Sequence, residues 1–149
     1  MRELEKSECW NRLRTSDVGR IAVYAEVEGV DIFPVNHVVD GGTIVFRTAD
    51  GTKLARIDNG YAVAFEVDGT DGTDGSEHAW SVVVRGTAHV ISRREELFDI
   101  FDLDVRPWHD GDKPRFVRIV PESVTGRDFT VSAPSVGCEG RLDGGEPGC

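Results

Sequence analysis

Hydrophobic and polar residues alternate along several stretches of this chain, and a period of two is typical of β-strands that bury one face. The clearest stretch lies between residues 80 and 91, where six residues share one face: Trp80, Val82, Val84, Gly86, Ala88 and Val90. Its length suits a strand that curves around a barrel. We expect the bend at Gly86, because glycine tolerates the backbone distortion.

Shorter strands are predicted on both sides of this stretch, at residues 20–27, 30–39, 43–48, 61–67 and 115–120, with 124–127 continuing the last. Gly29 and the run Asp40-Gly41-Gly42 supply residues that hairpin turns need. Pro34 cannot donate a backbone hydrogen bond, so it should lie at an edge, a bulge or a bend. Residues 68–79 favour a solvated hairpin loop over a calcium loop, because the alternate acidic positions and the final glutamate of an EF-hand are missing.

Three short helices are expected at residues 7–14, 53–58 and 92–103. Ser7 is a suitable cap for the first helix, in which Trp10 and Leu13 share a face. Ser92 and Glu95 have the spacing of a capping box for the third. Six or seven strands with three short helices favour a small antiparallel β-barrel, because closure leaves no strand edge exposed.

Length and composition refine this picture of one barrel domain. A chain of 149 residues suits one core. Beyond residue 131 glycine, proline and charged residues dominate, so we expect a domain over 1–131 and a disordered tail over 132–149. The net charge of −10 disfavours nucleic acid and anionic membranes as partners. No apolar run approaches the roughly 20 residues of a membrane span, and we expect a cytoplasmic protein.

Most kinds of catalytic or metal site find no support in the residue spacing. The four histidines, at positions 37, 78, 89 and 109, lack ligand spacing, and the three cysteines form no CxxC pair. A nucleophile elbow and a GxGxxG run are both missing. The sequence therefore predicts no metal ligand and identifies no catalytic acid, base or nucleophile.

The segment from Phe46 to Leu54 is the strongest candidate for ligand binding. It has the pattern of a strand end, a polar turn and the start of a short helix, and it carries Arg47, Thr48, Thr52 and Lys53. Two cations, two hydroxyls and a helix N-terminus suit a phosphate. A solvated turn, in which the two cations pair with nearby aspartates, explains the same spacing. The spacing alone leaves both readings open.

Several segments, in this order, resemble the pyridoxamine 5′-phosphate oxidase-like flavoproteins over about residues 7–130: Pro34-Val35-Asn36-His37, Phe46-Arg47-Thr48, Gly51-Thr52-Lys53-Leu54, Ala64-Phe65-Glu66-Val67-Asp68 and Trp80-Ser81-Val82-Val83-Val84-Arg85-Gly86. The resemblance implies a mainly β fold, a split barrel of six to seven antiparallel strands. It further implies a homodimer that binds flavin mononucleotide (FMN), or a deazaflavin in some branches, between its subunits.

The resemblance also assigns roles to individual residues. The contacts it implies for the flavin phosphate are Arg47, Thr48, Thr52 and Lys53. Those for the isoalloxazine ring are Pro34, Val35 and Asn36. Trp80 and Ser81 match positions near the flavin, although the alternation of faces favours Ser81 as the outward one of the two. Arg127 resembles a contact contributed by the partner subunit.

One departure from the family pattern bears on the substrate. The vitamin-processing oxidases end in basic and aromatic substrate contacts, whereas this chain ends in a glycine-rich tail, so pyridoxamine phosphate is not the expected substrate. We expect an FMN-dependent oxidoreductase acting on an unidentified small molecule. The alternatives are a non-catalytic barrel that carries or senses flavin, deazaflavin or haem, with His37 as an axial ligand, and a barrel whose groove serves dimerisation alone.

Overall fold

The computed structural model describes residues 1–25, 29–48, 60, 62–73, 76–91 and 115–131. These residues form one helix and seven strands: β1 (Arg2–Glu3), α1 (Lys6–Thr15), β2 (Val18–Ala25), β3 (Gly29–Asp40), β4 (Thr43–Thr48), β5 (Ala62–Thr73), β6 (Ser76–Val90) and β7 (Arg115–Val131). The mainly β, antiparallel fold expected from the sequence is confirmed. The helices expected at 53–58 and 92–103, and the tail at 132–149, lie outside the described residues.

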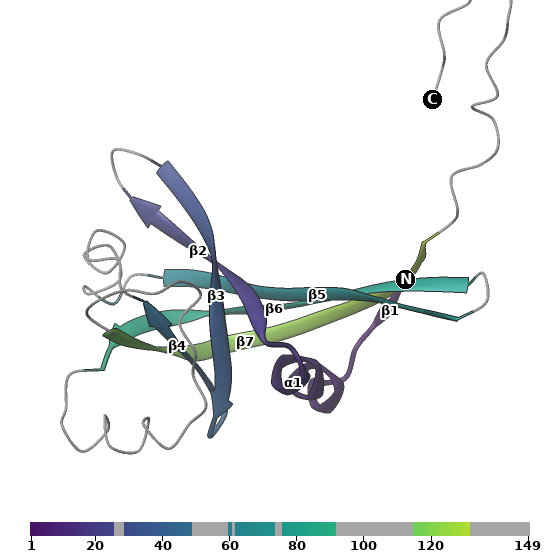
Figure 1. Cartoon of the computed structure of the whole chain (residues 1–149), viewed down its shortest axis with the longest axis horizontal. Helices are drawn as coiled ribbons and strands as arrows, with labels where there is room; N and C mark the ends of the chain where they lie inside the picture. Colours follow the sequence, from purple (N-terminus) through teal and green to yellow (C-terminus); the bar gives the residue numbers. More distant parts are fainter. Residues whose placement is uncertain (26–28, 49–59, 61, 74–75, 92–114, 132–149) are drawn as a thin grey trace, which may run out of the picture.

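All seven strands belong to one antiparallel sheet with the order β1-β7-β4-β3-β2-β5-β6. A further pairing joins β6, the last strand of this order, to β7, the second, and closes the barrel. Figure 1 shows the long strands β5, β6 and β7 side by side, with the β2–β3 hairpin crossing them and α1 next to the sheet. Closure satisfies the backbone groups that an open sheet would leave at its edges.

Strand β3 changes its partner along its length. Its first part pairs with β2 as far as Asn36, and the part from His37 to Asp40 pairs with β4. Pro34 lies in the first part, opposite Arg20, where the described residues place a strand on one side only. It therefore occupies an edge, one of the three positions expected. The predicted hairpin between β2 and β3 is also confirmed, with Gly29 at a φ of 79°.

Strand β6 follows the predicted alternation. Its buried face carries Trp80, Val82, Val84, Gly86 and Ala88, whereas the side chains between them are half-buried or exposed. The register with β7 shifts between Arg85 and Gly86, where Pro121 lies opposite. A Cβ atom on Gly86 would collide with the carbonyl oxygen of Val120, so the close approach of the two backbones requires glycine at this irregularity.

The core fills the inside of the barrel, and α1 packs against it through Cys9 and Leu13. Two local expectations were wrong. The residue preceding α1 is Glu5, with no side-chain cap bond, so Ser7 lies within the helix and is not its cap. In β4, Ile44 and Phe46 alternate with Val45 and Arg47, which predicts a strand with one buried face, yet both faces are buried at its centre. The reason is a second apolar cluster on the outer side, formed by Val45, Ile91 and Phe116.

The stretch at residues 68–79 was expected to be a solvated hairpin loop; the hairpin is confirmed, but most of the stretch is strand and not loop. Strand β5 continues to Thr73 and β6 begins at Ser76, with continuous pairing from Asp68–Ser81 to Thr73–Ser76. Backbone pairing satisfies groups that a loop would leave to water, and this outweighs the low strand propensity of the Asp-Gly pairs. None of the described helices is long and apolar enough to cross a membrane. The cytoplasmic location stays a prediction.

Candidate functional site

The predicted cofactor residues on β3 lie on both of its faces. Pro34 is exposed and Asn36 half-buried on the outer face, whereas Val35, at 3% exposure, packs in the core. The side chains of Pro34 and Asn36 are therefore accessible to a ligand, and that of Val35 contributes to packing. All three follow from the alternation of a strand that is buried on one side.

The described part of the predicted phosphate site lies at the end of β4. Arg47 is half-buried, and its guanidinium lies 5.9 Å from the centre of the Phe116 ring. Thr48 is buried, at 7% exposure. Thr52 and Lys53 lie outside the described residues, so the convergence of all four groups on one phosphate stays a prediction.

The predicted residues on β6 and β7 separate into an outward pair and an inward side chain. Ser81 lies directly opposite Arg127 in the β6–β7 register, on the outer face. Trp80 lies on the core face with 7% exposure, and the guanidinium of Arg12 lies 4.5 Å from the centre of its ring. The preference for Ser81 as the outward residue is thus confirmed.

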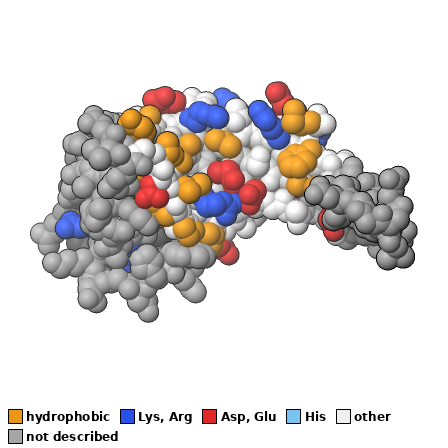
Figure 2. Space-filling model, turned by 90° about the horizontal axis from the view of Figure 1, so that it is seen from above, with side chains coloured by type: hydrophobic (Ala, Val, Ile, Leu, Met, Phe, Trp, Pro, Cys, Tyr) orange, Lys and Arg blue, Asp and Glu red, His pale blue; other side chains and the backbone are white. Residues whose placement is uncertain are grey.

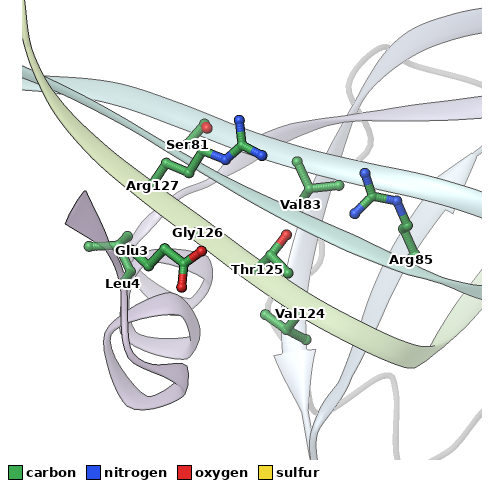
Figure 3. A pocket seen from close by; sticks show the side chains of 9 residues that line it. All are labelled: Glu3, Leu4, Ser81, Val83, Arg85, Val124, Thr125, Gly126 and Arg127. Atoms are coloured by element: carbon green, nitrogen blue, oxygen red, sulfur yellow. The ribbon is translucent and has the colours of Figure 1, made fainter. Parts of the chain in front are cut away.

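A pocket of about 470 Å³ opens over β6 and β7 where Ser81 and Arg127 meet. It is lined by Glu3, Leu4, Ser81, Val83, Arg85, Val124, Thr125, Gly126 and Arg127. Figure 3 shows Arg127 and Arg85 leaning toward Val83 from opposite directions. Neither Arg85 nor Thr125 was among the predicted site residues. The signal was present for Arg85, which shares the outward face of β6 with Ser81.

The two arginines that line this pocket differ in their partners from Arg20 and Arg118. Arg20, on β2, contacts Glu66 at 2.9 Å and Asp68 at 2.6 Å, and Arg118 contacts Asp40 at 3.0 Å. Among the described residues, the side chains of Arg85 and Arg127 form neither an ion pair nor a hydrogen bond. Their guanidinium groups are therefore open to an anionic ligand.

His37 connects α1 to the barrel wall. Only 5% of His37 is exposed, and its ring packs edge-on against Phe65 with 4.9 Å between ring centres. Nε2 donates to the carbonyl oxygen of Leu13 over 2.9 Å, so the neutral ring carries its proton on Nε2. Burial lowers the pKa of His37, and the Leu13 carbonyl and the charge of Asp17 offset this in part.

The position of His37 also bears on the haem alternative. One ring nitrogen is engaged with Leu13, and the other, Nδ1, is buried in the core without a partner among the described residues. A haem iron needs an accessible nitrogen, so the geometry does not support His37 as an axial ligand. The described residues also contain no group of three or more metal-ligating side chains.

The outer face of the β2–β3 hairpin exposes large apolar side chains next to Pro34. The exposed fractions are 55% for Tyr24, 73% for Val30 and 62% for Ile32. Tyr24 lies directly opposite Val30, so these side chains gather on one face. Figure 2 shows hydrophobic side chains among acidic and basic ones on one face of the molecule. Clustered exposed apolar side chains are typical of an interaction surface.

The chain is similar in sequence and in structure to known proteins. Residues 5–128 match the protein-family model described as pyridoxamine 5′-phosphate oxidase. A solved structure from Corynebacterium glutamicum is 41% identical, with a TM-score of 0.74, covering 87% of this chain and 98% of that one. The FAD binding protein from Mycobacterium smegmatis is 36% identical, with a TM-score of 0.74, covering 88% and 100%. An uncharacterized protein of Mycobacterium tuberculosis is 36% identical over 92 residues, 62% of this chain and 80% of its own length.

Proposed function

The chain belongs to the pyridoxamine 5′-phosphate oxidase family, and from this premise we propose that it binds a flavin nucleotide and acts as a flavin-dependent oxidoreductase on a small molecule. The observation that carries the proposal is its 36% identity, over 88% of its length, to the FAD binding protein from Mycobacterium smegmatis. The shared split barrel provides the scaffold, and the outward side chains provide the chemistry.

The residues present fit such a cofactor. Arg47 lies at the end of β4 in reach of solvent, and a guanidinium forms strong, charge-assisted hydrogen bonds with phosphate. We propose that Arg47 and Thr48, with Thr52 and Lys53, hold the flavin phosphate. Pro34 and Asn36 lie on the accessible face of β3, where Asn36 can offer both a donor and an acceptor to the polar edge of the ring.

A bound flavin supplies the electron-transfer chemistry. The chain's own part is to bind the nucleotide, orient the ring and limit access of water. No catalytic acid or base is assigned to a residue of this chain, because the flavin can carry the oxidation and reduction while the protein positions it.

We further propose that the flavin sites lie between two copies of the chain. The apolar patch formed by Tyr24, Val30 and Ile32 borders Pro34 on the outer face. Covering such a patch stabilises an assembly, because it removes apolar surface from water. A second copy would also bring additional side chains to the ring edge near Asn36.

Two flavin nucleotides, FMN and FAD, are candidates for the bound cofactor. FMN is the prediction from sequence, and the named Mycobacterium smegmatis relative binds FAD. Both carry the isoalloxazine ring and a phosphate on the ribityl chain, so both fit the proposed contacts at Arg47 and Asn36.

The test is to purify the full chain, incubate it separately with FMN, FAD and a deazaflavin, and desalt each sample. Retained cofactor is identified by its absorbance spectrum and by chromatography after heat release. We expect stoichiometric retention of FMN or FAD and a spectrum that bleaches on anaerobic reduction. Retention of neither flavin would overturn the proposal. Retention of a flavin that cannot be reduced and reoxidised would overturn the oxidoreductase part and leave a carrier.

A further inference from the structure

The pocket over β6 and β7 is lined by two arginines that form no ion pair with a described carboxylate. Among the described residues, Arg20 and Arg118, two of the arginines on the barrel strands, contact acidic side chains. Arg85 and Arg127 do not. The protein has a net charge of −10, yet these two arginines line one pocket without an ion pair, which makes them candidate ligands for an anion. Like charges repel, and an anion between them removes that repulsion.

The strand register places these two arginines on either side of the Val83–Thr125 pair. Arg127 lies opposite Ser81, and Thr125 lies opposite Val83, two residues from Arg85 on β6. At about 3.3 Å per strand residue, each arginine starts roughly 7 Å along the strands from the Val83–Thr125 pair. An extended arginine side chain spans a comparable distance. Figure 3 accordingly shows both side chains leaning toward Val83.

The pocket has the size and the mixed lining of a small-molecule site. Its volume of about 470 Å³ lies within the range of roughly 300–1,000 Å³ that ligand pockets occupy. Val83, Val124 and Leu4 provide apolar surface. The hydroxyl groups of Ser81 and Thr125 can donate to or accept from a ligand. Glu3, opposite Arg127 in the β1–β7 register, also lines the pocket, and it forms no ion pair with Arg127.

We infer that Arg85 and Arg127 together bind an anionic group, a phosphate or a carboxylate, of a small molecule in this pocket. Ser81 and Thr125 add neutral hydrogen bonds. The inference deepens the proposed function and rests on it for the ligand's identity, because Ser81 and Arg127 are also predicted flavin contacts. Arg85 and Thr125 are new to the site. The anion comes either from the second phosphate of an FAD or from an acidic substrate beside the flavin.

The first experiment uses the full chain and three variants: Arg85→Gln, Arg127→Gln and, as the control, Arg14→Gln. Arg14 is exposed on α1, so its replacement makes the same change in net charge away from the pocket. Dissociation constants for riboflavin, FMN and FAD are measured by fluorescence titration. Circular dichroism and thermal unfolding establish that each variant folds.

The second experiment uses flavin-loaded protein and titrates inorganic pyrophosphate and phosphate, with binding followed by thermal shift and calorimetry. If the pocket takes the second phosphate of FAD, Arg85→Gln binds FAD about ten- to a hundredfold more weakly and binds FMN unchanged, and Arg127→Gln loses at least as much affinity for FAD. If it takes an acidic substrate, Arg85→Gln leaves the affinities for FMN and FAD unchanged, and both pocket variants lose pyrophosphate binding by a similar factor. Either result supports the inference, provided that Arg14→Gln behaves as the wild type.

Two results would overturn it. One is wild-type binding of FAD, phosphate and pyrophosphate by both pocket variants. The other is an equal loss in Arg14→Gln, which would assign the effect to net charge. Failure of the wild type to retain any flavin is a different outcome, and it would overturn the proposed function first.

Discussion

Replacing His37 by glutamine should remove a pH-dependent part of the stability of the barrel. Glutamine can still donate to the Leu13 carbonyl that His37 Nε2 contacts at 2.9 Å, but it cannot titrate. The lost ring contact with Phe65 and the imperfect replacement of the hydrogen bond should cost about 1–3 kcal/mol at neutral pH. Denaturation by urea, followed by tryptophan fluorescence, gives this difference directly.

The pH dependence follows from the lowered pKa of His37. Burial disfavours the charged ring, so the folded pKa lies below the unfolded value of about 6.5. Protonation on Nδ1 would bury a charged donor that has no partner among the described residues. The unfolded state therefore binds the proton first. The contribution of His37 is complete above about pH 6.5 and is lost as the pH falls from there toward the folded pKa.

The size of this effect has an upper limit. One differential proton changes the free energy of unfolding by at most about 1.4 kcal/mol per pH unit. We expect the wild type to lose stability relative to His37→Gln below pH 6.5, with the two curves parallel above it. His89→Gln, which removes an exposed histidine, is the control and should follow the wild type. Parallel curves for wild type and His37→Gln down to pH 5 would refute the reasoning.

Three further predictions follow from named contacts. Gly86→Ala should destabilise the protein by about 1–3 kcal/mol, because its Cβ meets the Val120 carbonyl; an unchanged urea midpoint would contradict the close approach at this irregularity. Phe65→Ala empties a fully buried position and should cost about 3–5 kcal/mol; a loss below about 1 kcal/mol would place that ring outside the core. Arg47→Gln should weaken FMN binding by about 1.5–3 kcal/mol while Arg14→Gln leaves it unchanged; equal affinities in a fluorescence titration would remove Arg47 from the phosphate site.

The strands that carry a local alternation could be predicted from the sequence. The faces of β6 are an example: Trp80 was expected inside and Ser81 outside, and both expectations are confirmed. Side-chain direction along a strand depends on the residue's own position in the period of two, so no distant contact is needed to assign it. The turn at Gly29 was also predictable locally, because glycine accepts the positive φ that a tight turn needs.

Features that depend on distant partners could not be predicted in the same way. The Asp-Gly composition of residues 68–73 indicates a loop, yet these residues pair with 76–81 and extend the hairpin. Val45 was expected on an open face, and it is buried because Phe116 and Ile91 meet it from other parts of the chain. Burial by residues far away in sequence leaves no mark on the local pattern.

The candidate site depends both on the local sequence pattern and on contacts between residues that are distant in sequence. The family resemblance identifies Ser81 and Arg127 separately, 46 positions apart, and the register of β6 and β7 brings them opposite one another. The same register adds Arg85 and Thr125 to the pocket. The alternation of side chains along β6 could have identified Arg85, because it shares a face with Ser81. Thr125 could not be identified in this way, because its partner on β6 depends on the register between β6 and β7, which shifts at Gly86.

The central claim, that this barrel binds a flavin, is tested most directly by thermal unfolding in the presence of flavin. A ligand that binds the native state alone at 100 times its dissociation constant stabilises it by about 2.7 kcal/mol. For a chain of this size that raises Tm by roughly 5–10 °C. We predict this rise with FMN or FAD, and a smaller one with riboflavin, which lacks the phosphate. An unchanged Tm with both FMN and FAD at saturating concentration would contradict the claim.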